Sequence, residues 1–163
     1  MIVTHDLGVA RLLSHRIIVM RGGEIAQSGT PRELYDAPNS VFVATFMGEA
    51  NHVKGELRIG AQSAPALHLG PLVHPVPGTR CAAGPVDVVI RPEAIRLEPA
   101  TPPGSLPATV RTATYMGANF EYVLDTAVGE LFAVVPGTQI SHTQGTQVGV
   151  TLGERGVFVL PPT

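Results

Sequence analysis

The sequence predicts a mainly β fold, in which a small barrel or sandwich over residues 49–163 follows a short α/β segment over residues 1–48. Apolar residues recur at helical spacing within the first segment. In the second segment, short runs rich in valine, threonine and aromatic residues alternate with glycine and proline, as strands separated by turns do. Regularly spaced short strands are typical of small β-barrels and sandwiches. The change of pattern near residue 48 therefore predicts two domains.

The first segment opens with a short apolar run at residues 2–4, which predicts the end of a buried strand. His5 follows directly, and in open α/β sheets ligands bind beyond the carboxyl ends of the strands. His5 is therefore the candidate functional residue of this segment. Asp6 is placed to cap a short helix whose apolar residues continue to about Ser14.

A β-hairpin is predicted next along the chain. Residues 16–20 form an apolar run that predicts a fully buried strand, and residues 24–27 are its expected partner. Gly22 and Gly23 lie between the two runs and can supply the positive φ of a tight turn. We expect the hairpin to close at Gly29.

Two short helices are predicted after the hairpin. Residues 30–33 combine a threonine N-cap, a proline at the first helical position and a glutamate placed for a capping box, so a helix is expected to run to about Asp36. A second helix begins after a cap at Asn39 or Ser40 and ends at Gly48. The side chains expected to face inward from it are Val43, Phe46 and Met47.

The β-segment contains six runs that predict strands and three that predict loops. The strand runs are residues 86–91, 108–116, 120–125, 131–135, 147–152 and 157–160. The loop runs, rich in proline, glycine and small residues, are residues 61–66, 76–85 and 99–107.

Composition argues against several classes of function. With a net charge of −2, 15% charged residues and 5% aromatic residues, the chain lacks the basic groove and stacking platforms that nucleic acids need. No apolar stretch approaches the roughly 20 residues that span a bilayer. We therefore expect no nucleic-acid partner and no direct membrane insertion. The lone Cys81 and the scattered histidines lack metal-ligand spacing, so no metal site is expected.

The start of the chain resembles a known nucleotide-hydrolysing family. Residues 3–6, with the strand run at residues 16–20 behind them, are similar to the switch-histidine region of ATP-binding-cassette (ABC) transporter ATPases. The resemblance implies that His5 contacts the γ-phosphate of ATP and helps to hold the attacking water. Two positions depart from the pattern, because many relatives carry glutamate at Val9 and aspartate at His15.

Two further stretches carry the same resemblance. The first looks like the segment that joins the nucleotide-binding domain to the regulatory domain in ABC import ATPases, at Gly29-Thr30-Pro31, Glu33-Leu34-Tyr35, Pro38, Phe42-Val43-Ala44, Phe46, Gly48 and Asn51. The second resembles the transport-associated OB-type (TOBE) regulatory domain, at Val89-Ile90-Arg91-Pro92-Glu93, Ile95-Arg96-Leu97, Tyr115-Met116-Gly117, Tyr122-Val123-Leu124 and residues 145–150. The resemblance implies that residues 1–48 are the C-terminal remnant of a P-loop ATPase domain and that residues 49–163 form an OB-like TOBE domain.

The resemblance implies the C-terminal regulatory portion of the ATP-binding subunit of an ABC importer, with ferric iron or polyamine as the favoured solute. In the intact parent the cofactors would be ATP and Mg²⁺, and the partners would be permease subunits and a second ATPase subunit, on the cytoplasmic inner face of the cell membrane. This chain contains no G-x-x-x-x-G-K-[ST] loop, and its single lysine, Lys54, follows no glycine cradle. We therefore expect neither enzyme activity nor a bound cofactor for the chain as it stands.

Self-association is also expected. The apolar strand runs of the first segment belong to a sheet that the parent would cover on both faces, and bare apolar strand edges pair with other chains. The expected assembly is a homodimer, formed through the first segment or through TOBE strands.

An alternative function is a stand-alone module that binds a small oxyanion. Such a site would need clustered cationic groups, and the candidates are Arg80, Arg91, Arg96 and Arg111. The competing interpretation of Arg91 is structural, because Arg91-Pro92-Glu93 is typical of a strand exit whose arginine and glutamate pair locally.

Overall fold

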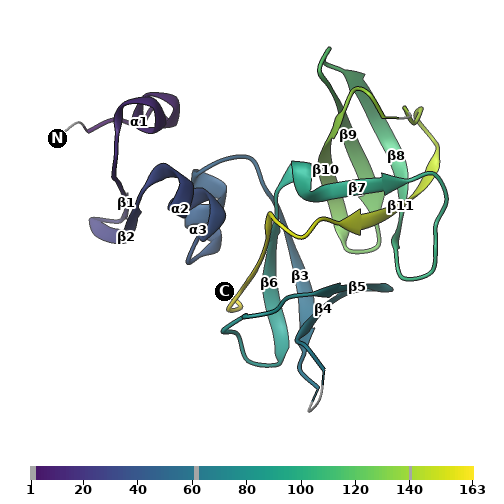
Figure 1. The fold of residues 1–163 in the computed structure, drawn as a ribbon, viewed down its shortest axis with the longest axis horizontal. Coiled ribbons are helices and arrows are strands. Elements are labelled where there is room, and N and C mark those ends of the chain that lie inside the picture. The colour runs from purple at the N-terminus through teal and green to yellow at the C-terminus, as the bar shows by residue number, and fades with distance from the viewer. Residues whose placement is uncertain (1–2, 61–62, 140) are drawn as a thin grey trace. The chain divides into compact units, whose positions relative to one another are not determined.

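The computed structural model describes residues 3–60, 63–139 and 141–163 (Figure 1). The chain divides into two compact units, Met1–Glu49 and Ala50–Thr163. Within the described residues, no helix is both long and apolar enough to cross a membrane.

The first unit has the order helix, hairpin, helix, helix. Its elements are α1 (Leu7–Leu13), β1 (Ile17–Arg21), β2 (Glu24–Gly29), α2 (Pro31–Asp36) and α3 (Val41–Phe46). The hairpin turns through Gly22 and Gly23, whose φ angles are 59° and 86°, and only glycine adopts such a pair of angles readily. Each helix and strand predicted after His5 in this unit is present in the structure.

Side-chain caps begin all three helices of this unit. The Val9 amide donates to Asp6 Oδ1 (3.0 Å) at α1. At α2, Thr30 and Glu33 form the predicted capping box, in which the Glu33 amide donates to Thr30 Oγ1 (3.2 Å) and the Thr30 amide to Glu33 Oε2 (2.8 Å). At α3 the Val43 amide donates to the Ser40 hydroxyl (3.3 Å), which decides between the two predicted caps.

Three expectations for the first unit are wrong. Val3 and Thr4 form no strand, and Ile2 lies outside the described residues. β1 is not fully buried, because Ile18 and Met20 are 53% and 57% exposed while their neighbours Ile17 and Val19 point into the core. Only one face of this two-stranded sheet packs on the helices, and the other face is exposed. Its residues therefore alternate between core and surface.

The third error concerns Phe46, which was expected to face inward. Phe46 is 44% exposed and stacks on Phe42, with ring centroids 5.8 Å apart. The core of this unit consists of Ile17, Val19, Leu34, Val43 and Met47.

The second unit is built from two five-stranded antiparallel sheets. Its elements are β3 (Asn51–Arg58), β4 (Ala66–Leu69), β5 (Leu72–Pro75), β6 (Gly84–Ile90), the 3-10 helix η1 (Pro92–Ala94), β7 (Ile95–Glu98), β8 (Leu106–Tyr115), β9 (Asn119–Thr126), β10 (Gly129–Pro136), β11 (Gln147–Leu152) and β12 (Val157–Leu160). The strand orders are β10-β9-β8-β11-β7 and β12-β6-β3-β4-β5. The mainly β prediction is confirmed.

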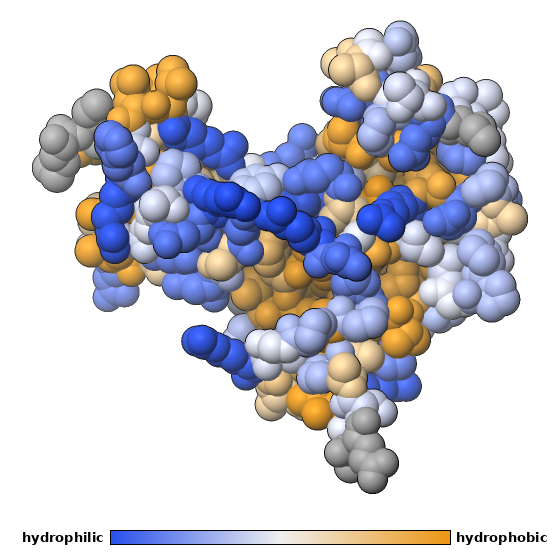
Figure 2. All heavy atoms as spheres, in the orientation of Figure 1, coloured by the Kyte–Doolittle hydropathy of each residue, from blue (hydrophilic) through white to orange (hydrophobic). Residues whose placement is uncertain are grey.

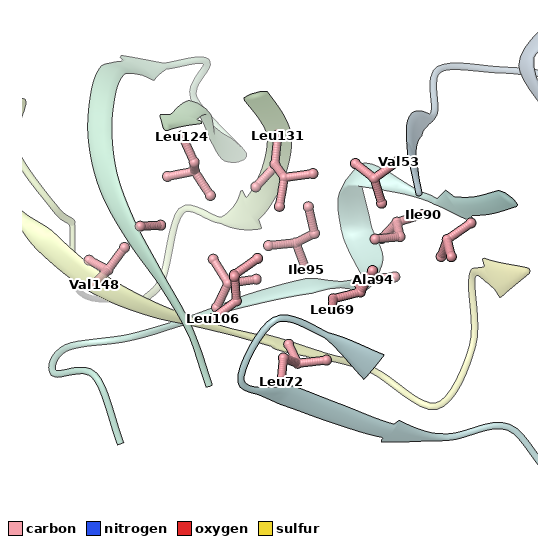
Figure 3. Close-up of a cluster of buried hydrophobic side chains, with 14 of the residues drawn as sticks. Val53, Leu69, Leu72, Ile90, Ala94, Ile95, Leu106, Leu124, Leu131 and Val148 are labelled. Carbon is pink, nitrogen blue, oxygen red and sulfur yellow. The ribbon is translucent and has the colours of Figure 1, made fainter. Parts of the chain in front are cut away.

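One hydrophobic core lies between these two sheets. Leu106, Leu124 and Val148 contribute from one sheet, and Leu69 and Ile90 from the other, and Figure 3 shows side chains of both sheets in one cluster. Burial of large aliphatic side chains contributes about 1.5–3 kcal/mol each. This shared core is what holds the two sheets together.

All six predicted strands are present, and four further strands were missed. β3, β4, β5 and β7 were not predicted, although β-structure was expected from residue 51 onward. β4 begins at residue 66, β6 at residue 84 and β8 at residue 106, so each predicted loop ends inside or beside a strand. Residues 61–62 of the first predicted loop lie outside the described residues.

Gly55 explains why β3 does not look like a strand in sequence. It lies in the middle of β3, where a side chain would place Cβ 2.8 Å from Leu67 Cδ1 and 2.9 Å from Val88 Cγ2. The glycine is therefore needed because the neighbouring strands fill the space above it. Its low strand propensity is offset by pairing with β6 on one side and β4 on the other.

The side chain of Asn51 joins the two sheets where β3 meets β10. Its Nδ2 donates to Ile90 O (3.1 Å) and Phe132 O (2.8 Å), and its Oδ1 accepts from the Phe132 amide (2.6 Å). Asn51 is 8% exposed. A single amide thus satisfies three backbone groups in two different sheets.

We predict that Asn51→Ala destabilises the second unit by about 3 kcal/mol, since buried backbone groups left unpaired cost about 1–3 kcal/mol each. Urea unfolding followed by near-ultraviolet circular dichroism measures the change. Asn119→Ala is the matched control, because Asn119 is exposed at the start of β9 and exposed substitutions change stability by about 0.5 kcal/mol or less. Equal stability of the two variants would contradict the proposed clamp.

Candidate functional site

His5 lies in an exposed bend directly before α1. The residues on either side of His5 form local hydrogen bonds. The Asp6 amide donates to Thr4 Oγ1 (2.9 Å), and Asp6 Oδ1 accepts from the Val9 amide (3.0 Å). Both neighbours thus direct their polar atoms into local bonds, and the imidazole remains exposed. An imidazole in this position can accept or donate one hydrogen bond to a ligand. The catalytic role of His5 stays a prediction.

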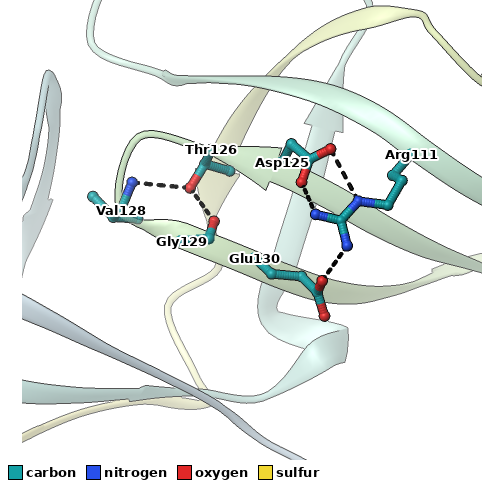
Figure 4. Close-up of polar contacts among 6 residues, drawn as sticks. All are labelled: Arg111, Asp125, Thr126, Val128, Gly129 and Glu130. Carbon is teal, nitrogen blue, oxygen red and sulfur yellow. Dashed lines mark hydrogen bonds and ion pairs between the residues drawn. The ribbon is translucent and has the colours of Figure 1, made fainter.

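The arginines proposed for an oxyanion site are engaged in different ways. Arg111 on β8 contacts two carboxylates of its own sheet, with Nε 3.0 Å from Asp125 Oδ2 and a further bond to Glu130 (Figure 4). Arg91 is fully buried at the end of β6, where its guanidinium carbon lies 5.6 Å from the centroid of the Phe158 ring. Arg111 is therefore already neutralised by acidic partners.

A buried carboxylate that sequence analysis did not identify lies at the centre of a polar cluster in the second unit. Asp87 on β6 has no exposed surface, and its Oδ1 lies 2.6 Å from His52 Nε2 and 2.5 Å from Lys54 Nζ on β3. Its Oδ2 accepts from the amide (2.6 Å) and hydroxyl (2.9 Å) of Thr163. Asp87 thereby ties β3 and the residues after β12 to β6.

Burial raises the pKa of Asp87, but the hydrogen bonds from Lys54, His52 and Thr163 outweigh it and hold the pKa well below the usual range. A carboxylate that stays ionised at neutral pH is a weak proton acceptor. The cluster therefore suits a structural role better than acid–base chemistry.

The pairing register explains how the cluster forms. β3 and β6 are antiparallel neighbours with Lys54 opposite Asp87, and opposite residues of paired strands point to the same face. The sequence signal was an aspartate inside the apolar run of residues 86–90. A buried charge of this kind requires partners. Among the described residues, no group of histidine, cysteine, aspartate and glutamate side chains could hold a metal ion.

Comparison with known proteins identifies relatives of this chain. The model of the TOBE domain matches residues 88–160. The Fe(3+) ions import ATP-binding protein FbpC of Brucella abortus (strain 2308) is 39% identical over 158 residues, which are 97% of this chain and 44% of that protein. The corresponding protein of Agrobacterium fabrum is 41% identical over 160 residues, with the same coverage.

The chain belongs to the family of ABC importer ATP-binding subunits. It matches their C-terminal part, including the TOBE domain, and spans less than half the length of these relatives. The Spermidine/putrescine import ATP-binding protein PotA of Acidothermus cellulolyticus is also similar, with 39% identity over 142 residues, 81% of this chain and 36% of that protein. The predicted resemblance is thus confirmed.

A protein of known structure has a fold similar to that of this chain. The cytoplasmic molybdate-binding protein ModG matches with a TM-score of 0.52 and 20% identity, over 69% of this chain and 96% of that chain. This likeness concerns the fold, and it confirms the OB-like prediction.

We predict that the Asp87 cluster makes the stability of the TOBE-containing part depend on pH. Because the folded-state pKa is lowered, the contribution of Asp87 is complete above the unfolded-state value of about 4 and is lost as the pH falls through the folded-state value. The free energy of unfolding should therefore differ most between the original chain and Asp87→Asn at pH 7, and the difference should shrink below about pH 4.

Urea unfolding at a series of pH values from neutral to acidic measures this difference. Asp125→Asn serves as the comparison, because Asp125 pairs with Arg111 at an exposed site where solvent screening weakens ion pairs. A difference for Asp87→Asn that is the same at acidic and neutral pH would contradict the assignment.

Proposed function

We propose that this chain is the C-terminal regulatory portion of an ATP-binding subunit that drives solute uptake by an ABC importer. Its partners are the permease subunits and a second copy of the ATP-binding subunit, at the cytoplasmic face of the cell membrane. The observation that carries the proposal is the similarity to import ATP-binding proteins over 97% of the chain. That similarity includes both the first unit and the TOBE domain.

The solute is the finer part of the proposal. Two of the relatives described above are named for Fe(3+) ions and one for spermidine and putrescine. The FbpC proteins match 97% of this chain and PotA matches 81%. We therefore favour ferric iron over polyamines.

The surface of the first unit supports a role within a larger ATPase domain. Several large apolar side chains of α1 and of the β1–β2 hairpin are exposed, and Figure 2 shows apolar side chains on the surface of these elements. They include Leu12 (84%), Leu13 (59%), Ile18 (53%), Met20 (57%) and Ile25 (63%). Large exposed apolar patches mark interaction sites, and in the proposal these side chains pack against the nucleotide-binding part of the subunit.

In the proposal, His5 acts as the switch histidine. It contacts the γ-phosphate of ATP and orients the attacking water, while ATP and Mg²⁺ are held by the phosphate-binding residues of the same subunit. Its exposure at the start of α1 is compatible with that role. The present sequence contains no phosphate-binding loop of its own.

We predict that His5→Ala, in an ATP-binding subunit that joins this sequence to a phosphate-binding loop, lowers ATP hydrolysis by about 100-fold, a typical loss for a group that positions or activates the nucleophile. ATP affinity should change little, because the proposed contact concerns the γ-phosphate and the water. Turnover and equilibrium nucleotide binding measure the two effects. His15→Ala is the matched control, since His15 is also exposed in the same unit. Near-normal hydrolysis by His5→Ala would remove His5 from the site.

The isolated 163-residue chain should show no ATP turnover. Without a glycine cradle and its lysine, the β- and γ-phosphates have no dedicated cationic partner. Release of inorganic phosphate is compared between the chain and its His5→Ala variant. Hydrolysis that depends on His5 in the isolated chain would overturn this prediction.

A further inference from the structure

Two side-chain hydrogen bonds hold the backbone on either side of His5. The Thr4 hydroxyl oxygen accepts a bond from the Asp6 amide (2.9 Å), two residues further along the chain. Asp6 Oδ1 in turn accepts a bond from the Val9 amide (3.0 Å) in the first turn of α1. The residues before and after His5 are therefore connected to each other and to the helix.

The bond between Thr4 and Asp6 closes a ring that contains the backbone of His5. Rotation about φ or ψ of His5 would move the Asp6 amide away from the Thr4 oxygen, so the bond restricts both angles. Threonine and serine hydroxyls commonly form such bonds with the amide two residues on. Because the allowed side-chain rotamers depend on the backbone angles, the bond also limits the directions in which the His5 imidazole can point.

The Asp6 end of this ring is anchored by α1. Besides its side-chain cap, Asp6 accepts a backbone bond of the helix at its carbonyl oxygen, from the Ala10 amide (3.1 Å). Its own backbone is extended, with φ −86° and ψ 105°, as is usual for an N-cap residue. Thr4 thus ties the chain before His5 to a residue whose position the helix determines.

Local bonds matter here because the segment is not held by core packing. Thr4, His5 and Asp6 are all exposed, and α1 has no buried residue. Few buried contacts leave a segment free to open locally, and each ordered backbone residue costs conformational entropy that some interaction must offset. The Thr4 hydroxyl is therefore placed to decide how closely the direction of His5 is defined.

We infer that Thr4 is a positioning residue for His5, whose hydroxyl holds the bend so that the imidazole is directed toward the γ-phosphate and the attacking water. The inference deepens the proposed function and rests on it, since His5 is the catalytic residue there. Thr4 acts through His5 and does not itself touch ATP. Catalytic groups must be held in a reactive geometry to be effective, so a looser bend slows hydrolysis and leaves ATP binding intact.

The test compares Thr4→Val with Thr4→Ser in an ATP-binding subunit that joins this sequence to a phosphate-binding loop. Valine keeps the branched shape of threonine but lacks the acceptor oxygen, whereas serine keeps the oxygen. Thr4→Val should lower kcat about three- to tenfold, as expected for the loss of one hydrogen bond, with an unchanged KM for ATP. Thr4→Ser should retain near-normal kcat.

Thr45→Val is the matched control for this comparison. Thr45 is exposed in the same unit, and its hydroxyl donates to Val41 O (2.9 Å) within α3. The substitution therefore removes an exposed threonine hydroxyl and its local bond without changing the bend at His5. Its kcat and KM should equal those of the original subunit.

A double-variant cycle separates positioning from a direct role of Thr4. If Thr4 acts through His5, adding Thr4→Val to His5→Ala should cause no further loss of kcat. An additive loss, a raised KM, or equal losses for valine and serine would overturn the inference. A fully active Thr4→Val beside an impaired His5→Ala would overturn the inference alone, whereas a fully active His5→Ala would remove the proposed role of His5 as well.

Amide hydrogen exchange in the 163-residue chain, followed by nuclear magnetic resonance, tests the bond itself. The Asp6 amide should exchange faster in Thr4→Val than in the original chain or in Thr4→Ser. The Val9 and Ala10 amides should stay equally protected in all three chains, because their acceptors lie on Asp6, and this shows that α1 remains folded. Unchanged exchange of the Asp6 amide in Thr4→Val would also overturn the inference.

Discussion

The second unit depends on the closure of its two sheets around one core, and the Asn51 amide is the polar contact that completes it. Strands β3 and β10 lie in different sheets and share no ladder, so the backbone groups at their junction need another partner. Asn51 supplies one acceptor and two donated bonds there. Because buried amides and carbonyls are costly when unpaired, this residue fixes how the sheets meet. The core residues of Figure 3 then pack between two surfaces whose separation is set.

Sequence analysis predicted those elements whose signal is local. The capping box at Thr30 and Glu33, the double-glycine turn and the valine-rich strands each depend on residues that are adjacent in the chain. β3 was missed because its character is set by distant neighbours: Gly55 is required by Leu67 and Val88, which lie 12 and 33 residues further along. The expectation that β1 is fully buried failed for a related reason, since burial depends on how many layers cover a strand rather than on its own composition.

The candidate site shows the same division. His5 could be named as a candidate because the residues that carry its resemblance are contiguous, and the helix cap beside it was predicted from Asp6 alone. The Asp87 cluster joins residues that are 33, 35 and 76 positions apart, and no local pattern connects them. The sequence could indicate only that an aspartate inside a buried strand needs cations or hydrogen-bond donors as partners. The register of β3 against β6 decides that Lys54 and His52 meet this requirement.

The two units differ in how completely they cover their own apolar surface, and this difference bears on their roles. Both sheets of the second unit contribute to a single core, and its polar junctions are internally satisfied at Asn51 and Asp87. The first unit has a core of five residues and exposes apolar side chains on both α1 and its hairpin. Side chains such as Leu12 would each gain about 1.5–3 kcal/mol from burial, so an apolar surface of this size favours association. In the proposed function, the second unit is therefore a self-contained regulatory module, and the first unit supplies the apolar surface through which this module joins the nucleotide-binding part of the subunit.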